Sequence, residues 1–152
     1  MLAAAILFCL IAGSLGSLVT GTGPGSWYAQ LAKPLFQPPD WIFAPVWTLL
    51  FILMGIALYL IWEQGTERPE VRYAIYVFCM QFALNILWSF LFFGLQSPLL
   101  ALLDIIVLWW AILATTMIFY KVRKSAAYLL LPYFAWVSFA TILNASIYFL
   151  NP

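Results

Sequence analysis

The sequence has very little charge and no histidine. Only 7% of its 152 residues are Asp, Glu, Lys or Arg, whereas 66% are hydrophobic and the mean hydropathy is +1.05. Soluble domains carry roughly 25% charged residues, so this chain cannot cover a water-facing surface, and an ordinary soluble domain is excluded. A net charge of +1 excludes the strongly basic face that nucleic acids need. The missing histidine removes the commonest metal ligand and the usual proton shuttle.

The motifs of most catalytic sites are missing as well. The two cysteines, Cys9 and Cys79, lie in apolar runs and are interpreted as small buried hydrophobic residues rather than a disulfide framework. No apolar run holds a pair of carboxylates, and no glycine-rich phosphate loop follows a strand pattern. We therefore predict no metal site, no required cofactor and no nucleic-acid partner. Asp104, the one acidic residue inside an apolar run, is interpreted either as a structural hydrogen-bonding group or as a functional group.

Five long apolar runs dominate the chain instead. A membrane-spanning helix needs about 20 mostly apolar residues. The first run lacks the positive residues that open a secretory signal, so we interpret it as a retained helix. The sequence therefore predicts an all-α integral membrane protein, with a single domain over residues 1–152 folded as a bundle of five transmembrane helices. The predicted spans cover approximately residues 2–20, 43–62, 73–93, 99–120 and 126–150.

The basic residues predict the orientation of this bundle. With five spans, the loops at 63–72 and 121–124 lie on the same side of the membrane as the N-terminus. These two loops carry five of the six basic residues, whereas the other side carries only Lys33. Because basic loops remain on the cytoplasmic side, we predict that the N-terminus is inside and the C-terminus outside. The five residues are Arg68, Arg72, Lys121, Arg123 and Lys124.

Three of the predicted helices carry a face of aromatic, polar and small residues at helical spacing. Lipid does not require tryptophan or asparagine at mid-depth. The three faces could enclose an aromatic-walled cavity for a flat apolar ligand, with the amides fixing its polar edge. Alternatively, the amides join helices and the indoles only fill core volume. The faces comprise Trp47, Phe51 and Met54, then Asn85, Trp88, Ser89 and Phe92, and finally Trp136, Phe139, Ala140, Leu143 and Asn144.

The segment from residue 21 to 42 alternates prolines with large aromatic side chains. Prolines limit the conformations that the segment can adopt. It could therefore fold back as a lid over the mouth of the bundle, or it could anchor the chain at the membrane interface. Lys33, the only basic residue on this side, could bind an acidic group of a ligand or extend to the lipid headgroups.

Short motifs follow one another along the chain in a distinctive order. They are Trp27-Tyr28, Leu31, Lys33-Pro34, Pro38-Pro39, Trp41 and Pro45-Val46-Trp47; Asn85, Trp88 and Phe92-Phe93-Gly94; Ala101-Leu102 and Asp104; and Pro132-Tyr133, Trp136, Phe139-Ala140-Thr141 and Leu143-Asn144. Each motif alone is weak, but the ordered set covers nearly the whole chain. The set resembles the translocator protein family, also called tryptophan-rich sensory proteins or peripheral benzodiazepine receptors.

This resemblance implies a five-helix bundle, commonly a homodimer, with a pocket beneath the first loop. Its ligands would be tetrapyrroles such as protoporphyrin IX, together with synthetic isoquinoline carboxamides and benzodiazepines. By position, Trp88, Trp136, Ala140 and Leu143 would line the pocket, and Asn85 and Asn144 would be its polar contacts. With the faces described above, the predicted ligand-binding set is Trp47, Phe51, Asn85, Trp88, Trp136, Phe139, Ala140, Leu143, Asn144 and Lys33.

The predicted function is a membrane receptor or sensor for tetrapyrroles. The chain could instead be a light-dependent porphyrin-degrading enzyme, because Trp47 and Trp136 match tryptophans that the resemblance links to that reaction in some bacterial relatives. It could also be a porphyrin or sterol transporter, or a scaffold without a small ligand. No Lys or Arg follows Tyr148, so the apolar–Tyr–basic pattern tied to cholesterol in animal relatives is missing. We expect a bacterial cell membrane, or the mitochondrial outer membrane if the chain is eukaryotic.

Overall fold

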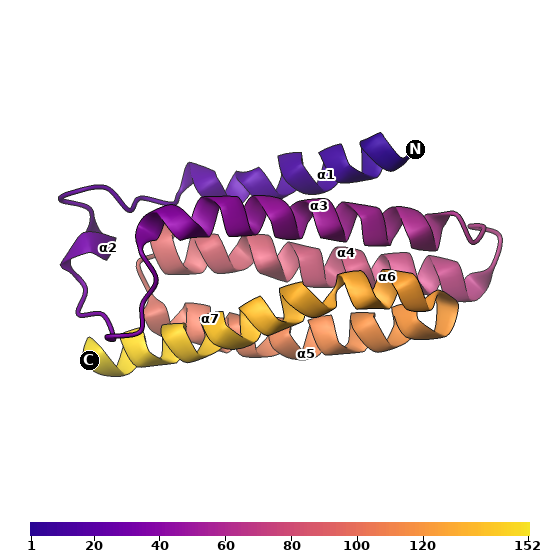
Figure 1. Cartoon of the computed structure of the whole chain (residues 1–152). Helices are drawn as coiled ribbons and strands as arrows, with labels where there is room; N and C mark the ends of the chain where they lie inside the picture. Colours follow the sequence, from indigo (N-terminus) through magenta and orange to yellow (C-terminus); the bar gives the residue numbers. More distant parts are fainter.

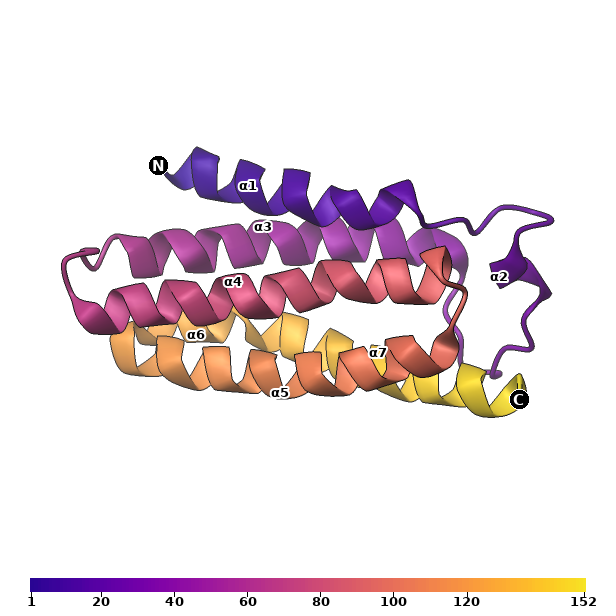
Figure 2. The ribbon, with the colours of Figure 1, turned by 180° about the vertical axis from the view of Figure 1, so that it is seen from behind.

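The computed structural model describes residues 1–152 and contains helices but no strands (Figure 1). Long helices run side by side along one axis, and the two termini lie at opposite ends of the bundle (Figures 1 and 2). The prediction of an all-helical bundle is confirmed. In chain order the elements are α1 (Leu2–Ser14), η1 (Leu15–Leu18), α2 (Trp27–Gln30), η2 (Asp40–Ile42), α3 (Phe43–Trp62), α4 (Pro69–Ser89), η3 (Phe90–Gly94), α5 (Pro98–Val122), α6 (Lys124–Leu129) and α7 (Leu131–Leu150).

Four helical segments are long and apolar enough to cross a membrane, and the last of them contains a break at Leu130. They cover Asp40–Trp62, Pro69–Gly94, Pro98–Val122 and Lys124–Leu150, with lengths of 23, 26, 25 and 27 residues. The N-terminal segment Leu2–Leu18 is apolar but shorter, and its last turn tightens into the 3₁₀ geometry of η1. The protein is therefore an integral membrane bundle of four long helices and one shorter helix.

Prolines and a capping serine explain where α4 and α5 begin. Pro69 and Pro98 occupy the first turns of α4 and α5, where a missing backbone N–H costs no helical hydrogen bond. The Ser97 hydroxyl accepts a hydrogen bond from the Leu100 N–H at 3.3 Å and so caps α5. Because a helix can begin in polar sequence, α4 starts four residues before the span predicted at Tyr73.

The fifth predicted span is two helices rather than one. α6 ends at Leu129, α7 begins at Leu131, and Leu130 joins them. Pro132 has no N–H to donate to the carbonyl of Tyr128, one turn earlier, so the helix cannot continue without a break.

A buried polar chain joins α4 to α7 in the centre of the bundle. The Asn85 Nδ2 donates a hydrogen bond to the Tyr133 hydroxyl at 3.1 Å, and that hydroxyl donates to the Gln81 Oε1 at 2.8 Å. All three side chains are buried. Asp104 of α5 is also buried, with 7% of its surface exposed, but its Oδ2 has no hydrogen-bond partner and it does not join this group. Buried polar groups need hydrogen-bond partners, so the hydrogen bonds among Gln81, Asn85 and Tyr133 fix how α4 and α7 face each other.

The two loops near the N-terminal end are joined by an ion pair. The Arg123 Nη1 lies 2.8 Å from the Glu63 Oε2, across the α3–α4 loop and the α5–α6 junction. The Tyr59 hydroxyl donates to the other carboxylate oxygen of Glu63 at 2.8 Å. These hydrogen bonds from Tyr59 and Arg123 lower the pKa of the Glu63 carboxyl below its ordinary value. Glu63 is therefore ionised at neutral pH.

Candidate functional site

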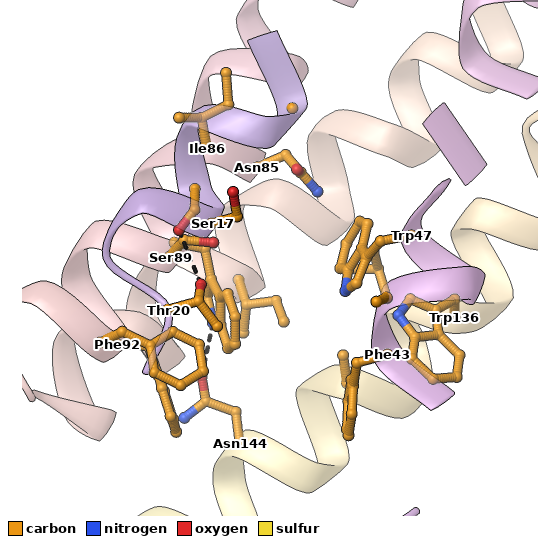
Figure 3. Close-up of a pocket in the computed structure, with 18 of the residues that line it drawn as sticks. Ser17, Thr20, Phe43, Trp47, Asn85, Ile86, Ser89, Phe92, Trp136 and Asn144 are labelled. Carbon is orange, nitrogen blue, oxygen red and sulfur yellow. Dashed lines mark hydrogen bonds between the residues drawn. The ribbon is translucent and has the colours of Figure 1, made fainter. Parts of the chain in front are cut away.

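A cavity of about 490 Å³ lies within the bundle, near the end that the segment 21–42 covers (Figure 3). Its wall is formed mainly by α1, η1, α3, α4, η3 and α7, with two residues of α5 behind it. Eight of the ten side chains in the predicted ligand-binding set lie in this wall. They are Trp47, Phe51, Asn85, Trp88, Trp136, Ala140, Leu143 and Asn144.

Aromatic rings form two opposite parts of the wall. Trp47 stacks on Phe51 with ring centroids 5.5 Å apart, and Phe43 meets Trp136 edge-on at 5.8 Å. Figure 3 shows the Trp47 and Trp136 indoles on one side of the space and Phe92 on the other. Such rings offer flat apolar faces to a ligand while their neighbours hold them in place.

The two asparagines differ in how much of each amide the protein uses. The Asn144 Oδ1 accepts from the Trp88 Nε1 at 2.9 Å, and its Nδ2 donates to the Pro98 carbonyl at 2.9 Å. Asn144 therefore joins α4, α5 and α7, as expected if the amides hold helices together. The Asn85 Nδ2 binds Tyr133, but the Asn85 Oδ1 forms no hydrogen bond within the protein. This leaves Asn85 with one acceptor for another partner.

Trp136 carries a buried polar atom that has no partner. Its Nε1–H is enclosed and forms no hydrogen bond within the protein. A buried donor without an acceptor costs on the order of 1–3 kcal/mol. Trp136 lines the cavity, but its Nε1–H is itself enclosed, so a bound molecule reaches this donor only if the indole turns.

The N-terminal segment contributes a wall that the sequence analysis did not assign to the site. Gly13, Ser17 and Thr20 line the cavity, and Figure 3 shows Ser17 and Thr20 opposite the indoles. Small residues occur at every fourth position of this segment, namely Ala5, Cys9, Gly13 and Ser17, and this pattern indicates close helix packing. The same pattern could have indicated this wall, because the Phe51 ring occupies the space that a side chain at Gly13 would need. A Cβ at Gly13 would lie 2.5 Å from that ring.

The segment 21–42 closes one end of the cavity around Tyr28. This side chain lines the cavity, is buried, and packs against Phe92 and Phe93 with ring centroids 6.2 and 5.5 Å away. Gln37 Nε2 donates to the Tyr28 hydroxyl at 2.6 Å. Burial, followed by the nearby negative charge of Asp40, raises the pKa of Tyr28 to about 12. Tyr28 is therefore a neutral part of the cover.

The end of the chain holds the cover at a second point. The Asn151 Oδ1 accepts from the Ala32 N–H at 2.9 Å, and the Asn151 Nδ2 donates to the Ala32 carbonyl at 2.9 Å. The same Nδ2 also donates to the Ile147 carbonyl at 2.8 Å, which fixes the amide against the last turn of α7. Asn151 thus clamps the backbone of the segment 21–42 to α7.

Two predicted site residues lie outside the cavity wall. The Lys33 Nζ stands 4.0 Å from the centre of the Tyr28 ring, on the cover. Phe139 packs against Trp136 and against Phe36 of the cover, with ring centroids 5.5 and 6.3 Å away. Both therefore contact residues that surround the cavity rather than the cavity itself. The wall contains no group of three acidic or cysteine side chains that could hold a metal.

The chain is similar to a single family along almost its whole length. The model of the TspO/MBR family matches residues 5–150. Tryptophan-rich protein TspO of Chlorobaculum tepidum is 49% identical over 152 residues, which covers 99% of this chain and 96% of that protein. Translocator protein of Homo sapiens is 41% identical over 141 residues, covering 88% and 82%. Tryptophan-rich sensory protein of Cereibacter sphaeroides is 35% identical over 122 residues, covering 80% and 74%.

Proposed function

The chain belongs to the TspO/MBR family, and we propose that it is a membrane receptor or sensor that binds tetrapyrroles such as protoporphyrin IX. The observation that carries this proposal is the covered cavity whose wall holds the Trp47 and Trp136 indoles. A flat macrocycle gains from stacking on such rings. The Asn85 Oδ1 is an acceptor for its polar atoms. The Trp136 Nε1–H, which is enclosed and unpaired, is a donor once the indole turns toward the cavity. Isoquinoline carboxamides and benzodiazepine-type compounds are flat and apolar too, and would use the same space.

The proposal includes a fifth membrane crossing by the N-terminal segment. At about 1.5 Å per residue, a helix of this length spans about 26 Å, close to the roughly 30 Å hydrocarbon core. The 17 residues Leu2–Leu18 are apolar and lie along α3 (Figure 1). With this crossing, the basic loops and the N-terminus share the inside, and the C-terminus is outside. A homodimer in a bacterial cell membrane, or in the mitochondrial outer membrane of a eukaryote, stays a prediction.

Titration with protoporphyrin IX in the dark tests the proposed function. The purified protein in detergent should show saturable quenching of its tryptophan fluorescence, because several indoles surround the cavity. An apolar dye of similar absorbance but without a flat macrocycle serves as the control for inner-filter effects. Quenching that rises linearly without saturation would count against a tetrapyrrole site.

A second candidate function, light-dependent oxidation of bound porphyrin by dissolved dioxygen, is favoured by one observation. The Trp47 and Trp136 indoles line the same cavity, so an excited porphyrin bound there would lie beside oxidisable rings. We expect Trp47→Phe and Trp136→Phe to slow the loss of the porphyrin absorbance band under light while dark affinity changes by only a few fold, about 1 kcal/mol or less. Bleaching at the wild-type rate in both variants would show that neither indole reacts.

We expect Asn151→Ala to speed the dissociation of protoporphyrin IX by about tenfold. The substitution removes both hydrogen bonds to Ala32, each worth roughly 0.5–1.5 kcal/mol, and so loosens the cover. The measurement is the recovery of tryptophan fluorescence after dilution of the loaded protein in the dark.

Tyr148→Phe is the matched control for Asn151→Ala, because it removes a polar group from the same helix end and the Tyr148 hydroxyl has no hydrogen bond within the protein. Backbone hydrogen exchange over residues 22–42 is a second readout that needs no ligand. It should rise in Asn151→Ala and stay unchanged in Tyr148→Phe. Unchanged exchange in both variants would mean that Asn151 does not hold the cover.

A further inference from the structure

A second, smaller cavity opens at the end of the bundle opposite the candidate site. Its volume is about 260 Å³, and every residue that lines it is hydrophobic. It lies between α1, α3 and α4, where α1 diverges from α3 toward the N-terminus in both views (Figures 1 and 2). We call it the N-terminal groove. Its lining residues are Met1, Ala4, Ala5, Phe8, Leu58, Tyr59, Trp62, Ile75 and Cys79.

The N-terminal groove has a buried floor and an exposed outer rim. The Phe8 ring lines the groove and packs against the Phe82 ring of the core, with ring centroids 5.9 Å apart. Leu58 forms part of a buried floor, whereas Trp62 is 50% exposed at the outer end of α3. A groove of this form fits a narrow hydrocarbon chain that enters from the membrane surface. Tryptophan near its mouth suits the lipid–water boundary.

A basic side chain without a partner stands beyond the mouth of the groove. Arg72 precedes Ile75 by three positions and Cys79 by seven on α4, so all three share one helical face, with Arg72 nearest the membrane surface. Arg72 is exposed and forms no ion pair or side-chain hydrogen bond. Its basic neighbours Arg68 and Arg123 are instead paired with carboxylates at 2.6 and 2.8 Å.

We propose that the N-terminal groove binds one acyl chain of an anionic phospholipid whose phosphate contacts Arg72. The apolar wall provides the energy of burying the chain. The guanidinium of Arg72 provides a planar, permanently charged fork that matches phosphate oxygens. This end of the protein carries five basic and three acidic residues, so its net positive charge favours an anionic headgroup. The inference does not depend on the proposed tetrapyrrole function.

Native mass spectrometry of the full-length protein with added phosphatidylglycerol or phosphatidylcholine tests the proposal. We expect the wild type to retain one phosphatidylglycerol more strongly than phosphatidylcholine. Arg72→Gln should weaken phosphatidylglycerol retention by about fivefold and leave phosphatidylcholine unchanged. Ala4→Phe, which fills the groove from an exposed position, should weaken both. The matched controls are Lys121→Gln, which removes an exposed charge from the same membrane end, and Ala3→Phe, which adds a ring outside the groove.

If Arg72→Gln and Lys121→Gln lose phosphatidylglycerol retention equally, the effect comes from the overall positive charge and not from Arg72. This result would overturn the proposal. A second result would also overturn the proposal: a dimeric wild type, a monomeric Ala4→Phe variant, and the same lipid retention in both. In that case a second copy of the chain would occupy the groove.

The thiol of Cys79 gives a second readout on the unmodified chain. Cys79 lines the groove and is exposed, whereas Cys9 is fully buried. In liposomes, phosphatidylglycerol should slow the reaction of Cys79 with a maleimide relative to phosphatidylcholine, and Arg72→Gln should remove that difference. Equal rates in both lipids for the wild type would overturn the proposal without any variant.

Discussion

Replacing Gly55 with alanine is expected to force α1 away from α3 and to destabilise the protein by about 1–3 kcal/mol. A Cβ at Gly55 would lie 2.6 Å from the Ile6 Cα and 2.9 Å from the Ile6 N. Both are backbone atoms, so no side-chain rotation relieves the clash, and the helices must separate. Thermal unfolding in detergent measures the lost stability.

Thiol labelling locates the expected change. Cys9 of α1 is fully buried in the wild type, and separation of α1 from α3 should make it react with a maleimide. Gly94→Ala is the matched control, because the nearest atom to a Cβ there is the Val19 Cβ at 3.9 Å, an ordinary contact. If Gly55→Ala melts like the wild type and Cys9 stays unreactive, the close approach of α1 to α3 is not a structural requirement.

The sequence predicts the spans well where an apolar run ends at a charged residue. The predicted span 43–62 coincides with α3, because Glu63 follows at once. Hydropathy marks the part of a helix that suits lipid, however, and not where the helix begins, so the first turn of α4 at Pro69 lies outside the predicted span. The break before α7 depends on the single residue Pro132. A hydropathy average over a whole span does not detect one such residue.

The candidate site is predictable where one helix carries the pattern and unpredictable where distant segments meet. Spacing alone places Asn85 and Trp88 on one face of α4, and both line the cavity. Spacing cannot reveal that Trp88 donates to Asn144, a residue 56 positions away. The contact of Asn151 with Ala32 spans 119 positions and involves a backbone partner, so no side-chain pattern predicts it.

A ring placed inside the cavity should abolish most ligand binding, and Ala140→Phe is the substitution that adds one. Ala140 lines the cavity on α7, between Trp136 and Leu143. A phenylalanine there would occupy space that the ligand needs, and because the side chain extends into a cavity, the bundle need not unfold to accept it. We expect the affinity for protoporphyrin IX to fall by at least about tenfold, or roughly 1.4 kcal/mol, in a dark fluorescence titration.

The opposite face of α7 provides the control that separates blocking from general damage. Ile142 is 60% exposed and does not line the cavity, so Ile142→Phe adds a ring of the same size to the lipid-facing surface. It should bind like the wild type. If Ala140→Phe also binds normally while both variants melt at the wild-type temperature, then the porphyrin binds elsewhere on the protein. If Ala140→Phe alone loses binding at an unchanged melting temperature, the loss reflects occupied space, because no polar contact of the cavity has been removed.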